Sequence, residues 1–270
     1  MYLYRWFVRR VQNTYTIRAY KNIGIFFFMT LVVTILAAGE GKRMRSDIPK
    51  VLHSVSGKPM LVRVVEAVRE IEKEMSLRMV VVTGRHHRAI VETLSKWIDI
   101  FGIVFIEQPV PIGTGHAVRC CMEQYAKGDK VLVLNGDMPL LTGGLLSRFV
   151  KDTRAVAAVI SAKIENPTGY GRILYGTRTF TGIVEEKDAT PEQREIREIN
   201  AGVYLFDATF LHEYLPKIKN ENQQREYYLT DIFILAEREA ITTFLLDKSE
   251  NVQIRGVNTP EELAELEAAL

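Results

Sequence analysis

Residues 31–44 read LVVTILAAGEGKRM, and this stretch decides the fold. Its first six side chains are all β-branched or aliphatic, which is typical of a strand buried on both faces in a parallel sheet. Small residues and glycines follow, up to Gly41, and then a cation, Arg43. Because ligands in such sheets bind beyond the carboxyl ends of the strands, we expect the chemistry in the loop after Leu36.

Strand and helix patterns alternate downstream of this stretch. After Pro59, apolar residues recur with helical spacing, at Leu61, Val64, Val65, Val68 and Ile71. Further buried strands are expected at 79–82, 103–106 and 131–134, with helical segments ending near residue 97 and starting after 113–114. Beyond residue 155 the pattern shifts to strands, at 156–162, 172–175, 182–186 and 202–206. The alternation predicts an α/β fold, a Rossmann-like doubly wound mixed sheet with a β-rich second lobe.

Composition excludes several classes of protein. The 270 residues are 47% hydrophobic and 25% charged, which is ordinary for a globular chain and unlike a disordered one. A net charge of +2 gives no drive toward nucleic acid or a membrane surface. The two cysteines, Cys120 and Cys121, are adjacent and lack metal-ligand spacing, so we interpret them as reduced thiols of a cytoplasmic protein.

The segment 1–28 differs from the rest of the chain. It carries five cations and no acidic residue, and it is rich in aromatic side chains. We favour its interpretation as sequence upstream of a start at Met29; the alternative is a targeting segment. An apolar run over 23–38 is shorter than a usual membrane span, and its second half is needed for the strand at 31–36, so we expect no stable membrane insertion.

The loop at residues 36–44, called the glycine loop below, does not fit two familiar phosphate-binding motifs. Met44 stands where a dinucleotide fingerprint needs its third glycine, and Arg43 stands where a Walker A loop needs Ser or Thr. What remains is a loop whose backbone can approach a ligand closely, followed by two cations, Arg43 and Lys50. This pattern suits a triphosphate, whose charge must be neutralised as the chain breaks.

Polar side chains also follow two of the other expected strands. Gln108 follows the third strand, and its amide offers the donor and the acceptor that match the N3–H and O4 edge of uracil. Asp137 follows the fourth strand, and a lone carboxylate beside a phosphate loop is a candidate Mg²⁺ ligand. The alternative for Asp137, a helix N-cap, is disfavoured because Pro139 delays any helix.

A series of motifs resembles a known family. The loop 36–44 with 49–53 is similar to the signature of sugar-phosphate nucleotidyltransferases, and further motifs narrow the resemblance: 113–117, 166–173, 183–189, 198–202, 226–231 and 256–258. In this order they resemble the pyrophosphorylase half of the bifunctional enzymes that make UDP-N-acetylglucosamine. The resemblance runs from about residue 31 to the C-terminus.

The resemblance implies an activity and a role for each matching position. The chain would transfer a uridylyl group from UTP to N-acetylglucosamine 1-phosphate and release pyrophosphate, with Mg²⁺ as cofactor. Arg43 and Lys50 would be catalytic. The nucleotide would be held by Leu36, Ala37, Ala38, Gly39, Gln108, Gly113 and Thr114. The sugar phosphate would be held by Gly171, Glu185, Asn200 and Thr230, and the metal by Asp137 and Asn258.

The resemblance also implies an organisation. A nucleotidyltransferase domain would cover 29–270, with a nucleotide half at about 31–155, a sugar-binding half at about 156–258 and a C-terminal helix at 259–270. We expect this chain to lack the acetyltransferase β-helix of the full-length enzymes and hence to be a monomer or weak dimer. Two residues depart from the family pattern: Lys42 replaces a common threonine and Asn135 a common tyrosine.

Local patterns give further expectations. Thr259 to Glu262 is predicted to form a capping box, which places Asn258 directly before a helix, and Leu263, Leu266 and Leu270 are predicted to face a core. We interpret His86 and His87 as the exposed start of a helix rather than metal ligands.

Two alternative functions stay open. The chain could transfer a nucleotide to another sugar 1-phosphate, with the sugar-binding residues changed. It could also be a non-catalytic sensor of nucleotide sugars, but such a sensor predicts loss of Arg43, Lys50 or Asp137, and all three are present.

Overall fold

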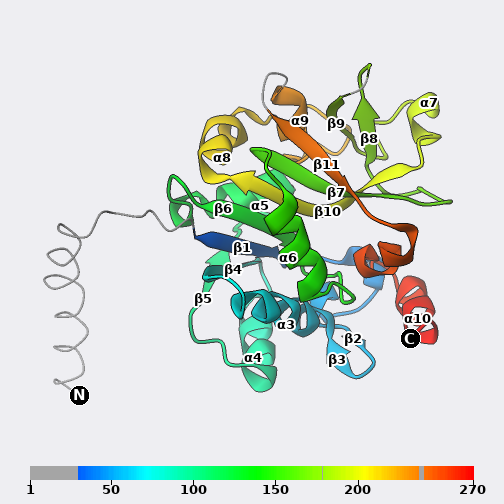
Figure 1. The fold of residues 1–270 in the computed structure, drawn as a ribbon. Helices are drawn as coiled ribbons and strands as arrows, with labels where there is room; N and C mark the ends of the chain where they lie inside the picture. Colours follow the sequence, from blue (N-terminus) through cyan, green and yellow to red (C-terminus); the bar gives the residue numbers. More distant parts are fainter. Residues whose placement is uncertain (1–29, 178, 237–239) are drawn as a thin grey trace, which may run out of the picture.

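The computed structural model describes residues 30–177, 179–236 and 240–270 (Figure 1). The expectations for residues 1–28 and for a start at Met29 lie outside these residues. The fold is a mixed α/β structure around one twisted sheet, as the sequence predicts. The sheet order is β11-β7-β10-β6-β1-β4-β5, and β8 pairs with β10 and β9.

The strands lie close to their expected positions. Those of the main sheet are β1 (Leu31–Leu36), β4 (Leu77–Thr83), β5 (Ile103–Glu107), β6 (Lys130–Asn135), β7 (Ala157–Lys163), β8 (Arg172–Tyr175), β9 (Phe180–Val184), β10 (Glu198–Asp207) and β11 (Ile241–Leu245). A small hairpin pairs β2 (Ser54–Val55) with β3 (Lys58–Pro59). The main sheet runs without interruption through both expected halves, so the second lobe is an extension of it.

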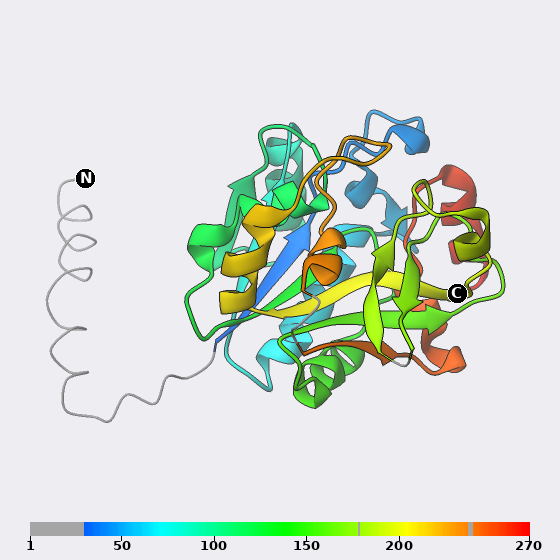
Figure 2. The same ribbon diagram turned by 90° about the horizontal axis from the view of Figure 1, so that it is seen from above.

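Helices cover both faces of the sheet. The α-helices of the described residues are α3 (Met60–Glu72), α4 (His87–Trp97), α5 (Thr114–Arg119), α6 (Gly143–Asp152), α7 (Pro191–Arg194), α8 (Ala208–Tyr214), α9 (Asp231–Leu235) and α10 (Pro260–Ala268). α3, α4 and α6 pack on one face against Val33 and Ile35 of β1, and α5, α8 and α9 pack on the other, where Val32 points. Figures 1 and 2 show these two layers with the sheet between them.

Strand direction brings distant residues to one edge. β1, β4, β5 and β6 are parallel, so their carboxyl ends lie together. β10 is antiparallel to β6, with Tyr204 opposite Val133. The start of β10, around Asn200, therefore lies beyond the carboxyl end of β6. A register shift between Asn200 and Tyr204, with Gly202 at φ +75°, bends the strand at this point.

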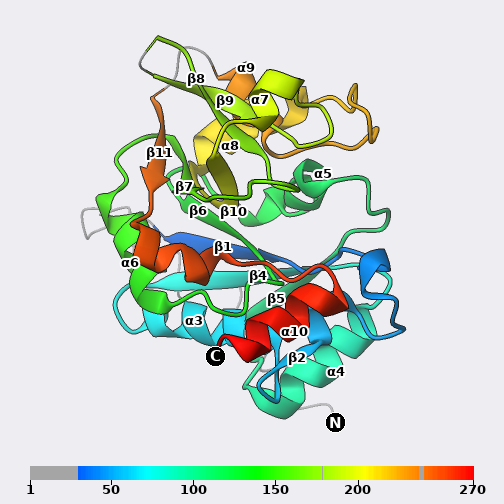
Figure 3. The same ribbon diagram turned by 90° about the vertical axis from the view of Figure 1, so that its right-hand side faces the viewer.

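A third, smaller core holds α10 beside the glycine loop. It joins Met44, Val55, Met60, Val257 and Leu266, and Figure 3 shows α10 lying next to the β2–β3 hairpin. Leu263 packs against this cluster, but Leu270 is 64% exposed, so the prediction for that residue is wrong. The helix ends at residue 268, so Leu270 lies beyond it and does not share its buried face.

The predicted capping box forms only in part. The Thr259 hydroxyl accepts a hydrogen bond from the Glu262 backbone N–H at 3.1 Å, as expected. The Glu262 carboxylate instead accepts from the backbone N–H of Asn258 at 2.6 Å, one residue earlier than the motif predicts. This shift fixes the backbone of Asn258. Over the described part of the chain, no helix is both long and apolar enough to cross a membrane.

Candidate active site

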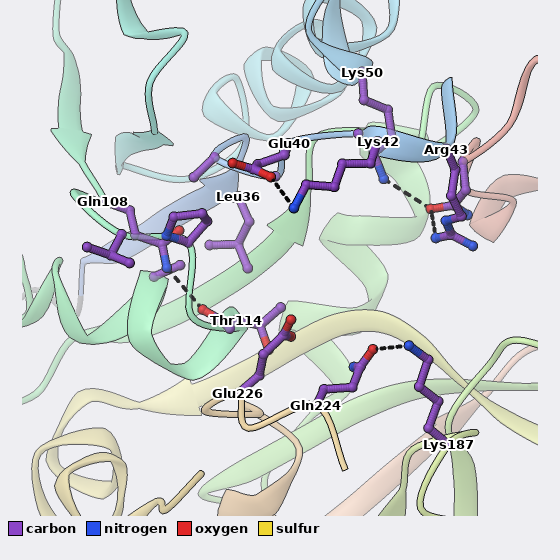
Figure 4. A pocket seen from close by; sticks show the side chains of 18 residues that line it. Leu36, Glu40, Lys42, Arg43, Lys50, Gln108, Thr114, Lys187, Gln224 and Glu226 are labelled. Atoms are coloured by element: carbon purple, nitrogen blue, oxygen red, sulfur yellow. Dashed lines mark hydrogen bonds and ion pairs between the residues drawn. The ribbon is translucent and has the colours of Figure 1, made fainter. Parts of the chain in front are cut away.

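A cavity of about 640 Å³ lies beyond the carboxyl ends of β1, β4 and β5 (Figure 4). Its walls come from the glycine loop, the segment 108–117 and residues of the second lobe. They comprise Leu36, Ala38, Gly39, Glu40, Gly41, Lys42, Arg43, Lys50, Gln108, Val110, Pro111, Gly113, Thr114, Ala117, Lys187, Gln224, Glu226 and Asn258. The cavity therefore opens where the sequence predicts the chemistry.

The glycine loop fits closely against Lys50. Gly41 has φ +62°, and a Cβ built there would lie 2.6 Å from the Cβ of Lys50. Both the backbone conformation and the close approach thus require glycine at this position. Met44 is buried in the third core cluster, which anchors the loop directly behind Arg43.

Four polar side chains converge beside this loop. The Lys50 ammonium forms an ion pair with the Asp137 carboxylate and donates to the Asn258 side-chain oxygen at 3.1 Å. Arg43 donates to the same Asn258 oxygen at 3.0 Å. In Figure 4, the dashed lines from Lys50 and Arg43 meet at one oxygen atom. Asp137 and Asn258 are thus brought together although 121 positions separate them in the sequence.

Backbone hydrogen bonds hold Asp137 and Asn258 in place. Gly136 N–H donates to the Leu36 carbonyl at 2.9 Å, which ties the end of β6 to the end of β1. Val257 N–H donates to the Asp137 carbonyl at 3.1 Å, so the residue before Asn258 is bonded directly to Asp137. The two side chains therefore share a rigid support.

This pair of oxygen donors fits Mg²⁺. A carboxylate and an amide carbonyl are the hard ligands that the ion prefers, and it is usually held by one or two protein groups together with phosphates and water. Among the described residues, no group of three or more His, Cys, Asp and Glu side chains could hold a metal ion. An ion at Asp137 and Asn258 would therefore take its remaining oxygens from water or from a bound phosphate.

The residues assigned to the nucleotide line the cavity, with one exception. Leu36, Ala38 and Gly39 face it, and a Cβ built at Gly39 would meet no atom within 4 Å. The side chain of Ala37 is buried, and its N–H donates to the Val82 carbonyl at 2.8 Å, so only its backbone contributes to the loop.

Gln108 is held differently from the simplest expectation. Its side chain is 4% exposed, and its Nε2 donates to the Gly113 carbonyl at 3.1 Å and lies 3.1 Å from His116 Nδ1. The donor half of the amide is thus used inside the protein. The expectation that a ligand meets both halves of this amide is therefore corrected, because the donor half is already engaged.

The segment 222–230 forms the opposite wall. The Tyr227 N–H donates to the Ile112 carbonyl (2.8 Å), and the Tyr227 carbonyl accepts from the Gly115 N–H (2.7 Å). The Thr114 hydroxyl accepts from the Leu229 N–H at 3.0 Å. Gly113 has φ +116°, and a Cβ there would lie 2.4 Å from the Tyr227 carbonyl oxygen. This glycine thus permits the contact between the two walls.

The residues assigned to the sugar form a second cluster. Asn200 N–H donates to the Gly171 carbonyl at 2.9 Å, and Thr230 donates to the Glu185 carboxylate at 2.8 Å. A Cβ at Gly171 would lie 3.3 Å from Glu185 and 3.4 Å from Asn200, so the four residues are neighbours. The Asn200 amide donates to the Tyr204 hydroxyl and accepts from Gly202 N–H, so it is firmly oriented.

Three residues that the second lobe contributes to the cavity wall have no role predicted from the sequence. Lys187 and Gln224 are hydrogen-bonded to each other and face the glycine loop, and Glu226 lies beside them (Figure 4). The signal for Lys187 and Glu226 was their place inside the motifs 183–189 and 226–231. Two residues depart from the family pattern, Lys42 and Asn135. Lys42 forms an ion pair with Glu40 at 2.7 Å. Asn135 lies close to Gly202, and a Cβ built on Gly202 would lie 2.4 Å from the amide nitrogen of Asn135.

The sugar-side cluster is acidic. Burial raises the pKa of Glu185 above its ordinary value, and the negative charges of Asp188 and Glu226 raise it further. The hydrogen bond from the Thr230 hydroxyl acts in the opposite direction and lowers this pKa. Burial also raises the pKa of Asp231 to about 6 from 3.8, with smaller contributions from Glu185 and Asp188. Negative charge gathered here suits a ligand with hydroxyl and amide donors.

We expect Asp231→Asn to stabilise the protein above pH 6. The folded state holds the Asp231 proton more tightly than the unfolded state between pH 4 and 6, so the free energy of unfolding falls as pH rises through this window. Removing the ionisation should recover about 1 to 2 kcal/mol above pH 6, after allowance for partial exposure, or a few degrees in Tm. Thermal unfolding at pH 4.5 and 7.5 measures the difference. The exposed Asp152→Asn is the control, and an equal Tm shift at both pH values would contradict the prediction.

Comparisons with known proteins find related sequences. Residues 33–199 match the family described as MobA-like NTP transferase domain. Proteins named "Bifunctional protein GlmU" are similar over most of the chain: that of Dechloromonas aromatica is 39% identical over 236 residues, and that of Francisella philomiragia is 41% identical over 244. These alignments cover 87% and 88% of this chain, which spans about half the length of these relatives, 51% in each case.

Solved structures share the fold. A UDP-glucose pyrophosphorylase complexed with UDP-glucose superimposes with a TM-score of 0.69 at 19% identity, covering 89% of this chain and 98% of the other. A putative glucose-1-phosphate thymidylyltransferase from Bacillus anthracis gives a TM-score of 0.66 at 20% identity, over 89% and 95%. These two structures show the shared fold, whereas the family match over more than half of the chain and the relatives of about 40% identity show that the chain belongs to the MobA-like NTP transferase family and is a nucleotidyltransferase.

Proposed function

We propose that this protein transfers a uridylyl group from UTP to N-acetylglucosamine 1-phosphate, giving UDP-N-acetylglucosamine and pyrophosphate. The observation that carries the proposal is the convergence of Arg43, Lys50, Asp137 and Asn258 beside a glycine loop. The identity of about 40% with the bifunctional relatives, over nearly nine-tenths of the chain, supports the choice of base and sugar.

The reaction needs charge neutralisation more than acid–base chemistry. A phosphate oxygen of the sugar phosphate attacks the α-phosphorus of UTP, the bond from that phosphorus to the bridging oxygen breaks, and pyrophosphate leaves with the electron pair. The attacking oxygen is already anionic, so no base has to remove a proton. Arg43 and Lys50 would stabilise the extra negative charge on the α-phosphate oxygens in the transition state, and the rigid loop would align the reacting groups.

Asp137 and Asn258 would hold the magnesium ion. When bound, Mg²⁺ supplies further neutralisation of the phosphate charge. The backbone hydrogen bond from Val257 to Asp137 keeps the two segments that carry these oxygen ligands side by side.

The two ends of the site would recognise the base and the sugar. The Gln108 carbonyl oxygen is available to accept the N3–H of uracil, because its amide nitrogen is held by Gly113. On the other side, Glu185 would accept from sugar hydroxyls, and the bend of β10 places the oriented Asn200 beside it.

We expect N-acetylglucosamine 1-phosphate to be preferred over glucose 1-phosphate by about 10²-fold or more in kcat/KM, because polar groups built for a partner are left unpaired when it is missing. Pyrophosphate release with UTP and each sugar phosphate in turn measures the ratio. Repeating the assay with CTP, dTTP, ATP and GTP tests the assignment of Gln108. Equal kcat/KM for the two sugars would favour transfer to another sugar phosphate, and no release with any pair would favour the sensor.

A further inference from the structure

Lys50 contacts both of the side chains that are assigned as metal ligands, Asp137 and Asn258. Its ammonium pairs with the Asp137 carboxylate and donates to Asn258 Oδ1 at 3.1 Å. The Lys50 and Asp137 side chains are only 17% and 13% exposed, so solvent screens their attraction weakly. A lysine ammonium therefore lies on the oxygens that would bind a divalent cation.

The remaining acceptor capacity at Asn258 Oδ1 is small. An amide oxygen has two lone pairs, and Asn258 Oδ1 accepts from both Lys50 and Arg43. A divalent cation entering here would meet two positive side chains and would have to replace their hydrogen bonds. The ion and the two side chains thus cannot share Asn258 Oδ1.

The structure also shows why Lys50 can leave while its backbone stays. The short 3₁₀ helix Lys50–Leu52 is anchored by the buried Val51, and Gly41 packs against the Lys50 Cβ. Beyond the Cβ, a lysine side chain is a flexible stem that carries a point charge. The ammonium can therefore move to another anion without any change in the loop.

We propose that Lys50 and a divalent cation compete for Asp137 and Asn258, so that the protein alone binds the ion weakly and a nucleoside triphosphate enables binding by drawing Lys50 onto its phosphates. This inference rests on the proposed function, since it uses the same triphosphate site. It goes further by making one lysine both the counter-ion of the metal ligands and a phosphate-binding group. The order of events follows: the ion binds with the nucleotide and not before it.

The test measures Mn²⁺ binding to the full chain without nucleotide, from the loss of the free Mn²⁺ signal in electron paramagnetic resonance. Lys50→Gln is expected to bind Mn²⁺ at least about tenfold more tightly than the unchanged protein, equivalent to about 1.4 kcal/mol. Lys50→Met, which keeps an apolar stem, should show the same gain and serves as a second variant if the first does not fold.

Lys42→Gln is the matched control. Lys42 lines the same cavity and carries the same charge, but it is 84% exposed and pairs with Glu40 rather than with Asp137. Its Mn²⁺ affinity should change less than about threefold, because the charge it removes is screened by solvent. Adding Asp137→Asn to Lys50→Gln should abolish the gain, which locates the ion.

The outcomes separate this inference from the proposed function. If neither Lys50 variant binds Mn²⁺ more tightly than Lys42→Gln does, competition is overturned, and pyrophosphate release by the unchanged protein still tests the function. If the Lys50 variants gain affinity and Asp137→Asn removes the gain, the inference stands even for a protein that releases no pyrophosphate. Equal Mn²⁺ affinity of the unchanged protein with and without UTP would also overturn it.

Discussion

Asp137→Asn is expected to lower kcat for pyrophosphate release by about 10²-fold or more while leaving the fold intact. The substitution keeps the shape of the side chain and removes the one negative charge in the Asp137–Asn258 pair. The backbone carbonyl of residue 137 still accepts from Val257 N–H, so the support of Asn258 is unchanged. Turnover at saturating UTP, with Mg²⁺ titrated, is the measurement.

The partner substitution tests whether both residues act through one ion. Asn258→Ala should have a similar or milder effect, because it removes a neutral ligand. The double variant should lose clearly less than the sum of the two single losses, since each acts on the same ion. Thermal unfolding checks that each variant is folded. A folded Asp137→Asn protein with near-normal turnover and unchanged Mg²⁺ dependence would move the metal elsewhere.

Local patterns were enough to place most of the scaffold. The run of β-branched residues predicts β1 with its observed bounds, because a strand buried on both faces must be apolar throughout. The helical spacing after Pro59 predicts α3, whose apolar stripe faces the first core. These signals are read within about ten residues, and tertiary packing here agrees with them.

What depends on distant pairing could not be predicted in the same way. The reversal of β10, and hence the position of Asn200 beyond β6, follows from strand pairing that leaves no local signal. The strand β11 was not predicted, although its β-branched residues Ile241, Thr242 and Thr243 were a weak indication. The meeting of Asp137 with Asn258 was expected from the family resemblance alone, and no periodicity in the chain indicates it.

The site shows the same division between what is local and what is distant. The sequence predicted that the Gln108 amide would meet the base of a nucleotide, but not that its nitrogen would donate a hydrogen bond to the Gly113 carbonyl. It indicated two cations near a phosphate, but not that Lys50 would pair with Asp137. The chemical character of a side chain can be read from its position in the sequence. Its hydrogen-bond partners depend on which loops the fold brings together.

Arg43→Ala is expected to lower kcat by about 10² to 10³-fold, the usual loss when one donor to the developing negative charge is removed. Arg43 is exposed, yet it is held between the buried Met44 behind it and the Asn258 oxygen in front. Arg43→Lys should recover only part of the loss, because an ammonium keeps the charge but not the planar pair of donors that fits a phosphate.

Arg85→Ala is the matched control for this prediction. Arg85 also pairs with a residue of the glycine loop, Glu40, at 3.7 Å, and its side chain is 62% exposed. The Arg85→Ala substitution removes one positive charge near the mouth of the cavity without removing a contact of Asn258. The kcat of this variant should stay within about threefold of that of the unchanged protein, because solvent screens the charge. If Arg43→Ala and Arg85→Ala lowered kcat equally, the guanidinium of Arg43 would act through the general field of the site. A loss confined to Arg43, with KM for UTP changed less than kcat, would mean that its hydrogen bonds to the phosphate strengthen in the transition state.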